Sequence, residues 1–473
     1  MAWKPAYIIL IILSTFVDYF CGLKMGSLDE KAKRKPFLYI SLLSNLGLLF
    51  FFKYYGFFAD SVDSFFAFMA LDFTSPALDL ILPMGISFYT FQTMSYSIDI
   101  YNGKLKPEKH FGIFALFVSF FPQLVAGPIE RASNLLPQFG RMTEIKFNSE
   151  RATRGLQQML WGMFKKVVIA DRLGVLVNSV YDQPEYFEGS SLLLATVFFS
   201  FQIYCDFSGY SDIAIGAAKI MGFDLMKNFD TPYASKTISE FWKRWHISLS
   251  TWFRDYVYIP MGGNRVVKWR WYYNLFITFL VSGLWHGANW TFVIWGALHG
   301  VYLIGAILLM PAKNNFNRLS GLDKFPQLKS FMDVGITFGL VMIGWVFFRA
   351  NHITDAIYII GGFFDGKTAD LTNLLSAVGG VFIGAGTLDN IGLGSDLMSA
   401  SGYSLGLTVF DFILAVGSII FMTIMESNFR MESFRLKWKS RPVYVKWGTY
   451  AMLIYVLLFF RNFESSEFIY FQF

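Results

Sequence analysis

The chain has 473 residues, of which 54% are hydrophobic, 19% are aromatic and only 16% are charged. Because ordinary soluble domains contain about 25% charged residues, this composition excludes a typical soluble protein and indicates a polytopic membrane protein. The net charge of +6 is small for so long a chain, and the two cysteines give no disulfide framework and no metal-ligand spacing. We therefore expect no bound metal or cofactor and no nucleic-acid partner.

Apolar runs recur along the whole chain. A helix needs about 20 apolar residues to cross the hydrocarbon of a bilayer, and ten runs reach or approach this length: residues 6–23, 37–58, 80–99, 167–182, 189–206, 271–287, 291–310, 332–349, 405–425 and 447–462. No signal-peptidase site follows the first run, so we expect it to stay as an anchor. The sequence predicts a single all-α membrane domain over residues 1–473, with ten or eleven transmembrane helices.

Lys and Arg gather in alternate loops, as they do in the cytoplasmic loops of membrane proteins. The basic segments are residues 24–35, 104–109, 131–166, 219–270, 313–329 and 430–446, and the loops 60–79, 182–188 and 365–396 are poor in basic residues. An even number of crossings would place both chain ends on the outer face. The apolar run 111–127 has basic segments on both sides, so we expect it to be re-entrant or buried in protein.

Residues 206–271 combine basic and aromatic side chains and separate two predicted crossings. Short amphipathic helices at the cytoplasmic membrane surface have this composition. Arg and Lys bind phosphate groups and aromatic rings stack on bases, so the segment also suits a phosphorylated donor. We identify Lys243, Arg244 and Arg254 as candidate donor-binding residues.

His286 lies in an almost uncharged run, residues 271–310. An ionisable side chain at membrane depth is costly unless it lines a polar cavity or takes part in chemistry. A buried neutral imidazole could serve as a general base, and Asn289 could polarise a carbonyl or hold a water in a donor site. The alternative is packing, because Gly283 and Gly287 have the spacing that brings helix backbones together.

The other four histidines differ in their surroundings. His246 lies among charged residues between positions 240 and 255. This density predicts either a satisfied buried network or an interfacial helix anchored by its Trp and Arg side chains. His110 and His352 are expected to be structural or solvated, and His299 is expected to be a packing residue.

Several longer motifs follow one another along the chain. They are Pro83-Met-Gly-Ile-Ser-Phe-Tyr, Gln123-Leu-Val-Ala-Gly-Pro-Ile-Glu-Arg, Tyr204-Cys-Asp-Phe-Ser-Gly-Tyr-Ser-Asp, Trp242-Lys-Arg-Trp-His-Ile-Ser-Leu-Ser-Thr-Trp-Phe-Arg-Asp-Tyr, Gly262-Gly-Asn-Arg and Gly283-Leu-Trp-His-Gly-Ala-Asn. This set resembles the core of the membrane-bound O-acyltransferase (MBOAT) family, and within it the bacterial alginate O-acetyltransferase, AlgI-like branch. Members usually begin with a further hydrophobic segment ahead of the counterpart of Trp3 and Lys4.

The resemblance implies a helical fold with a central funnel, a donor that enters from the cytoplasm, and an acyl group passed across the membrane. His286 matches the histidine that the family treats as catalytic, and His246 matches the second histidine of the site. The donor would be acetyl-CoA, the partner an extracytoplasmic acetyltransferase of the SGNH type or a related one, and the final acceptor a polysaccharide such as alginate. The expected location is the bacterial inner membrane, in contact with membrane lipid.

The chain ends in Phe468-Ile-Tyr-Phe-Gln-Phe, and the charge pattern places this tail, residues 463–473, on the outer face. Aromatic segments of this kind commonly anchor at the membrane interface. The tail also resembles the C-terminal Phe/Tyr motif of extracytoplasmic acylation systems, which implies that Tyr470 is an acyl relay or a partner docking site. A phenol is weakly nucleophilic at its pKa of about 10, so a relay would need a base such as His286.

Other functions stay open on the residues alone. The sequence does not fix the donated group, so D-alanyl or another acyl transfer to a wall polymer is an alternative. A secondary transporter would use polar residues in discontinuous helices near the midplane, although the two halves of the chain show no internal repeat. A non-catalytic subunit of a polysaccharide export system would explain the histidines as packing.

Overall fold

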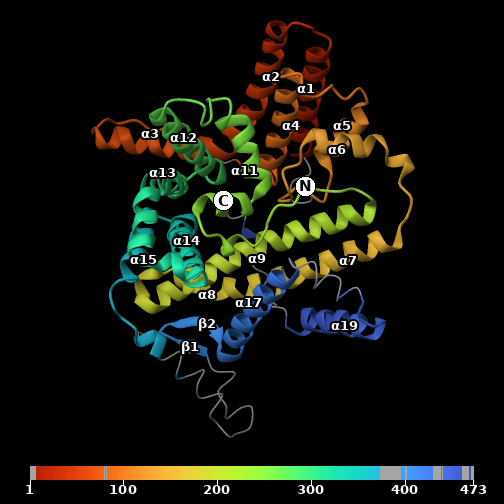
Figure 1. The fold of residues 1–473 in the computed structure, drawn as a ribbon. Helices are drawn as coiled ribbons and strands as arrows, with labels where there is room; N and C mark the ends of the chain where they lie inside the picture. The colour runs from red at the N-terminus through yellow and green to blue at the C-terminus, as the bar shows by residue number, and fades with distance from the viewer. Residues whose placement is uncertain are drawn as a thin grey trace.

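The computed structural model describes residues 7–372 without 79 and 81, and residues 376, 396–399, 402–429, 438, 440–460 and 468–469. Helices make up nearly all of the regular structure in these ranges (Figure 1). The sheet found there is an antiparallel pair of short strands, β1 (Asp396–Met398) and β2 (Ser404–Thr408). The predicted all-α membrane fold is confirmed.

An N-terminal bundle projects at the top of Figure 1 and consists of α1 (Ile8–Gly26), α2 (Lys31–Leu49) and α4 (Ile86–Tyr101), with α5 (Phe111–Ser119) and α6 (Ala132–Gly140) beside it. η2 (Phe50–Tyr54) and α3 (Tyr55–Phe68) continue from α2, and α3 runs sideways, away from the bundle. η2 is a π-helical turn inside a helix that runs from α2 into α3. The nine-residue α5 is too short to cross a bilayer and buries Phe114 and Phe117 in the bundle, as we expected of the run 111–127.

A pair of long antiparallel helices forms the middle of the molecule. The first consists of α7 (Ser149–Met163), the π-helical η4 (Phe164–Ala170) and α8 (Asp171–Tyr181), and the second is α9 (Gly189–Met221). Their backbones come close because glycines face each other: a Cβ on Gly162 would lie 2.5 Å from the carbonyl oxygen of Gly209. Small residues at such contacts are typical of packing between membrane helices.

The remaining elements follow in chain order. They are η3 (Met142–Glu144), η5 (Pro184–Tyr186), η6 (Pro232–Ala234), α10 (Ile238–Arg244), α11 (Ile247–Phe253), η7 (Arg254–Tyr258), α12 (Lys268–His286), α13 (Trp290–Leu319), η8 (Leu322–Lys324), α14 (Pro326–Arg349), α15 (Ile353–Gly362), α17 (Val409–Phe429) and α19 (Val443–Phe459). Of these, α14 and α15 pack directly on α9. The largest buried cluster draws on α9 to α14 and contains Trp245, Trp295 and Trp345.

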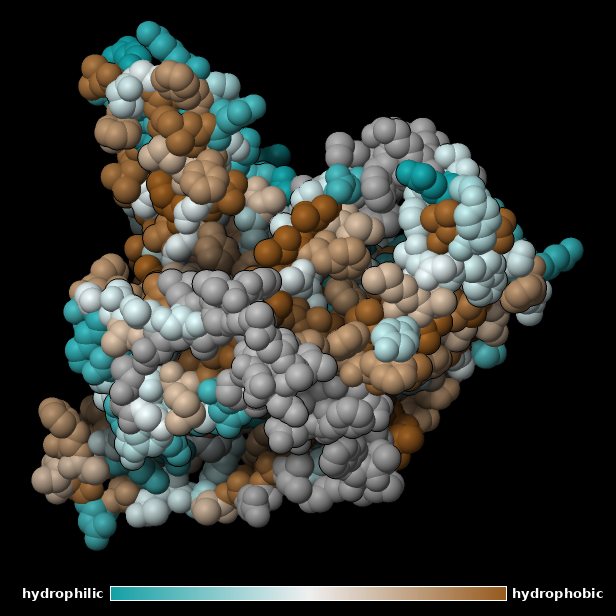
Figure 2. Space-filling view, turned by 90° about the horizontal axis from the view of Figure 1, so that it is seen from below, coloured by the Kyte–Doolittle hydropathy of each residue, from teal (hydrophilic) through white to brown (hydrophobic). Residues whose placement is uncertain are grey.

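Six helices in the described ranges are long and apolar enough to cross a membrane. They match the predicted crossings at 6–23, 37–58, 189–206, 291–310, 332–349 and 405–425. The other four predicted crossings fall on helices that are shorter or more polar: α4, η4 with α8, α12 and α19. Figure 2 shows hydrophobic side chains over much of the face seen from below, and large apolar residues such as Leu43 and Phe331 are exposed, as expected of surfaces that contact lipid.

Three predicted boundaries differ in the structure. The crossing at 80–99 begins only at Ile86, because Gly85 turns the chain with a φ of 78° where a Cβ would meet the carbonyl of Leu124. The crossing at 405–425 starts with β2, and its helix begins at Val409. The crossing at 189–206 continues as a helix to Met221, so the first part of the segment 206–271 belongs to a buried helix and not to the surface.

The aromatic side chains of α10 and α11 are also buried. Trp242, Trp245 and Trp252 are each less than 10% exposed, and they belong to the main core cluster. We expected them at the membrane surface because basic residues stand beside them. The structure turns Trp242 toward α13, Trp245 toward α14 and Trp252 toward α4. Lys243 and Arg254 stay exposed.

Candidate active site

His286 is the last residue of α12 and is almost completely buried. The helix ends there because Gly287 turns to extended backbone, and a Cβ at Gly287 would collide with the ring of Phe292. Aromatic rings surround the imidazole: Trp285 and Trp295 have centroids 5.0 Å away, and Phe348 lies at 5.3 Å. His286 therefore sits in an apolar wall at the end of a helix.

His246 joins α10 to α11 and has an unusual backbone, with a φ of 42°. A left-handed conformation costs energy for a residue with a Cβ, and such strain is often found at functional sites. The side chain is fully buried. Burial lowers the pKa of His246 to about 3, so the imidazole is neutral at physiological pH.

Asn228 fixes the orientation of His246. Nδ1 of His246 lies 3.0 Å from Oδ1 of Asn228, and the same oxygen accepts from the backbone N–H and the hydroxyl of Ser248. Because a backbone N–H can only donate, this Asn228 atom is an acceptor and His246 carries its proton on Nδ1. Nε2 keeps the lone pair and has no hydrogen-bond partner among the described residues.

The two histidines come from different segments and meet in the core. Their ring centroids are 6.5 Å apart, and Trp285 packs against both rings. His299 does not complete this pair, because its Nδ1 accepts from the indole of Trp242 at 3.3 Å and Trp295 lies between it and His286. The expectation that His299 is a packing residue agrees with these contacts.

Lys53 supports the end of α12. Its ammonium donates to the backbone carbonyls of Trp285 at 2.9 Å and of His286 at 2.8 Å. A cation at a helix C-terminus stabilises both the unpaired carbonyls and the helix dipole. We did not single this residue out from the sequence, although a lone lysine within the predicted crossing 37–58 is the kind of intramembrane charge that signals a site.

A cavity of about 540 Å³ opens beside His286. Its lining includes Lys53, Asn178, Asn289, Phe348 and Arg349. Arg349 is held by Asn178 at 2.9 Å and by Asp182 at 3.0 Å. Phe348 lines the cavity and also packs edge-on against His286, so one aromatic ring separates the cavity from the imidazole.

Asn289 has a structural task in this wall. Its carbonyl oxygen caps α13 by accepting from the backbone N–H of Thr291, and its amide donates to the carbonyl of Asn351 at 3.2 Å. It follows His286 in the turn after α12. The structure thus places Asn289 in the lining of the cavity, which does not include Lys243, Arg244 or Arg254.

Those three residues lie on the helices around His246. Lys243 is exposed, Arg244 is paired with Glu240 at 2.5 Å, and Arg254 is paired with Asp255 at 2.8 Å. Lys243 and Arg244 end α10, before His246 in the chain, and Arg254 begins η7, which follows α11. They flank the histidine segment without converging on one point.

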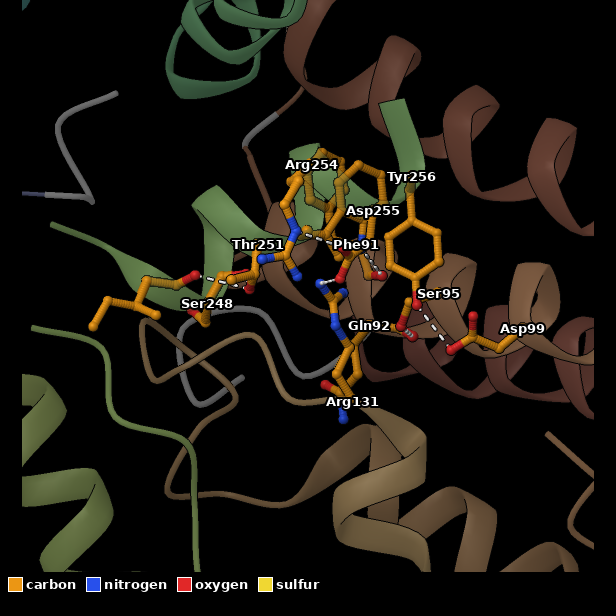
Figure 3. Close-up of polar contacts among 12 residues, drawn as sticks. Phe91, Gln92, Ser95, Asp99, Arg131, Ser248, Thr251, Arg254, Asp255 and Tyr256 are labelled. Atoms are coloured by element: carbon orange, nitrogen blue, oxygen red, sulfur yellow. Dashed lines mark hydrogen bonds and ion pairs between the residues drawn. The ribbon is translucent and has the colours of Figure 1, made fainter. Parts of the chain in front are cut away.

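Arg131, which we did not select from the sequence, lies near Arg254 and is more buried than it. Figure 3 shows Arg131 pointing between Asp255 and Tyr256, whose hydroxyl points toward Asp99. Arg131 lies 3.6 Å from Asp255 and 4.7 Å from the centre of the Tyr256 ring, and Tyr256 donates to Asp99 at 2.8 Å. Burial lowers the pKa of the Arg131 guanidinium. Its neighbour Ile129 donates to Ser248, so this cluster adjoins the His246 network.

A family model describes the membrane-bound O-acyltransferase family and matches residues 110–348, which include both histidines. The chain belongs to this family. It is 40% identical over 365 residues to the probable alginate O-acetylase AlgI of Pseudomonas putida, covering 76% of this chain and 72% of that protein. It is 36% identical over 384 residues to the peptidoglycan O-acetyltransferase of Helicobacter pylori, with 76% and 70% covered. Over 297 residues it is 30% identical to the teichoic acid D-alanyltransferase of Bacillus subtilis, with 58% and 71% covered.

Membership in this family makes the protein a multi-pass membrane O-acyltransferase. Within the described residues no group of three His, Cys, Asp or Glu side chains could hold a metal ion. The site offers two buried imidazoles in an aromatic wall, with a polar cavity on the other side of the Phe348 ring. Such a site can move a proton between an acceptor hydroxyl and a leaving group while excluding water.

The C-terminal tail enters the same core. Phe468 and Ile469 are buried, with exposed fractions of 9% and 2%, and both contact α9. Tyr470, which we singled out as a relay or docking residue, lies outside the described residues.

Proposed function

We propose that this protein takes an acetyl group from acetyl-CoA on the cytoplasmic side and passes it across the membrane for O-acetylation of an extracytoplasmic polysaccharide. The supporting observation is the meeting of His246 and His286, buried 6.5 Å apart beside a cavity. The similarity to alginate and peptidoglycan O-acetyltransferases favours acetyl as the donated group. We place the protein in a bacterial inner membrane.

The reaction needs one proton to move. The oxygen of an acceptor hydroxyl attacks the thioester carbonyl of the donor, and His286 takes the hydroxyl proton. The C–S bond then breaks, the coenzyme A thiolate leaves, and the proton passes to the sulfur, so that an ester and a free thiol result. Neutral His246, oriented by Asn228, offers its Nε2 lone pair as an acceptor that orients the hydroxyl or relays the proton.

The two reactants approach from opposite sides. The cavity is lined by Asp182 and by the turn after α12, both of which the charge pattern puts on the outer face. The basic residues Lys243, Arg244 and Arg254 belong to the cytoplasmic face on the same pattern and suit the phosphates of the donor. We propose that the acyl group passes from one region to the other at the histidine pair.

The first extracytoplasmic acceptor is a hydroxyl on Tyr470 or on a partner acetyltransferase of the SGNH type. Tyr470→Phe keeps the ring and removes the hydroxyl, so it should abolish polysaccharide acetylation if the tyrosine is a relay. Loss only on deletion of residues 468–473 would instead favour docking of the partner. Full acetylation by Tyr470→Phe contradicts the relay.

Purified protein in sealed vesicles tests the donor. Labelled acetyl-CoA should be consumed when added to the face that carries the basic loops, and consumption should be lost in His286→Ala. A carrier protein charged with D-alanine is the rival donor, because some relatives are teichoic acid D-alanyltransferases. Consumption of the D-alanyl thioester alone would replace acetyl with D-alanyl in the proposal, and consumption of neither would contradict it.

A further inference from the structure

One residue of the C-terminal tail, Ile469, is held by a carboxylate in the middle of α9. The backbone N–H of Ile469 donates to Oδ2 of Asp206 at 2.7 Å. Asp206 is 2% exposed, as is Ile469. The contact joins positions 263 residues apart, so the end of the chain returns to the core of the protein.

Asp206 is itself fixed by a buried ion network. The ammonium of Lys166 lies 2.7 Å from Asp206 and 2.8 Å from Asp171. One cation thus faces two carboxylates, and each buried carboxylate needs further donors to offset the loss of water. The Ile469 N–H supplies one to Asp206. We call Lys166, Asp171 and Asp206 the tail-docking site.

The π-helical stretch η4 supplies the lysine of the tail-docking site. Lys165 and Lys166 are consecutive, yet both contact acidic residues of α9: Lys165 pairs with Asp212 at 2.6 Å and Lys166 pairs with Asp206. Both lysines lie in the π-helical stretch Phe164–Ala170. Local π-helical turns are frequent at functional sites.

The docked residues lie next to the histidine network. The ring of Phe468 packs on Tyr210 at 5.3 Å and on Phe207 at 6.4 Å, and Lys166 lies 6.0 Å from its centre. Phe207 in turn packs edge-on against His246 at 4.6 Å. One aromatic ring therefore separates the docked tail from the imidazole of His246.

We propose that Asp206 and Lys166 are positioning residues that dock the chain's own C-terminal tail beside the histidine pair, so that the tail works inside the site during acyl transfer. The docking itself follows from the contacts above, and its consequence for transfer rests on the proposed function. A tail that served only as an interfacial anchor would need neither a buried carboxylate nor a backbone hydrogen bond at this place.

The rate of thiol labelling reports the docking of the tail and does not depend on an assay of acyl transfer. In a background with Cys21→Ala and Cys205→Ala, Ile469→Cys keeps the backbone N–H and should react slowly with a water-soluble maleimide. Adding Asp206→Leu removes the acceptor and should raise the labelling rate about tenfold or more, because hydrogen bonds to charged groups contribute strongly. Asp206→Asn keeps an acceptor oxygen and should give a smaller increase.

Asp212→Asn is the matched control. It disturbs an ion pair of the same helix with the buried Lys165, and in the described part of the chain Asp212 has no hydrogen bond or ion pair with Phe468 or Ile469. Its labelling rate should equal that of the parent. Equal rates for Asp206→Leu and the parent, or equal increases for Asp206→Leu and Asp212→Asn, would overturn the docking.

The consequence for transfer is read from the ratio of acyl transfer to donor hydrolysis. Ile469→Pro removes the donor N–H and leaves the ion network in place, and it should lower this ratio about tenfold, as should Asp206→Leu. An unchanged ratio despite faster labelling would overturn the positioning role. If the parent protein consumed no donor, or consumed it equally after His286→Ala, the proposed function would fail instead. Failure of the positioning role and failure of the proposed function are therefore distinguishable.

Discussion

Two buried polar networks differ in how completely their hydrogen-bonding groups are used. In the N-terminal bundle, Asn45 donates to Asp18 at 2.9 Å and accepts from Thr93 at 3.0 Å, and Ser41 donates to Asp18. Each of these polar side chains has a partner. Around His246, Asn228 is equally buried, but Nε2 of the imidazole is left without a partner in the described ranges.

This difference in hydrogen bonding distinguishes a network that only stabilises the fold from one that we propose takes part in the reaction. A fully satisfied network stabilises helix packing, and nothing in it is available to a substrate. A buried nitrogen with a lone pair and no partner costs free energy, and its position near a second histidine supports the reacting site that we propose. The same substitution, Asn→Ala, should therefore lower the rate of transfer in the network around His246 and the stability of the fold in the N-terminal bundle.

His286→Ala should have the largest effect. Loss of a general base typically lowers a rate by about 10² to 10⁴, and His246→Ala should cost less because that residue orients or relays. The measurement is the rate of acetyl transfer per folded protein, with folding followed by thermal unfolding. Transfer near the wild-type rate in a folded His286→Ala protein would contradict the assignment.

Asn228→Ala should lower transfer about tenfold to a hundredfold, because His246 would lose the partner that fixes its tautomer. The donor affinity should change little, since Asn228 lies in the interior. Rates measured across donor concentrations separate the two effects. A fall in affinity with an unchanged maximal rate would assign Asn228 to donor binding.

Asn45→Ala is the same substitution in the satisfied network. It should lower the free energy of unfolding by about 1–3 kcal/mol, because Asp18 and Thr93 would lose buried partners. Transfer per folded molecule should stay at the wild-type rate. A specific loss of transfer in this variant would mean that the bundle takes part in the chemistry.

Glu130 should make stability depend on pH. Burial raises its pKa to about 7, although Met226 and Asn134 donate to it. Because the pKa of Glu130 is higher in the folded than in the unfolded protein, the protonated carboxyl stabilises the fold fully below about pH 4.5. This contribution to the free energy of unfolding is lost as the pH rises through 7, and the loss amounts to about 1 kcal/mol between pH 6 and 8. Unfolding of Glu130→Gln measured over this range should lack that slope, and an identical slope in both proteins would exclude Glu130 as its source.

The smallest effects should come from Lys243→Ala and Arg254→Ala. Both side chains are exposed, so each should weaken acetyl-CoA binding by about 1 kcal/mol or less. The loss should be larger at low salt, because ions screen exposed charges. Titration calorimetry at two ionic strengths measures it, and unchanged affinity at low salt would remove these residues from the donor site. Arg131→Gln then becomes the next variant to measure.

The sequence alone predicted the class of fold, six of the helices that are long and apolar enough to cross, and the two histidines that the structure brings together. Long apolar runs specify helices in a membrane because every backbone group must be satisfied within the segment, and an ionisable residue inside such a run stands out by its cost. The lone Lys53 carried the same signal.

Only the tertiary structure decided which polar groups meet. Asn228 carries no local sign of its role, and it reaches His246 because the chain folds back between α9 and α10. The tryptophans beside Lys243 belong to the main core cluster, whereas the local pattern of basic and aromatic residues predicted the membrane surface. The bond from Ile469 to Asp206 links the chain end to the centre of α9, and no local pattern encodes a contact over that separation.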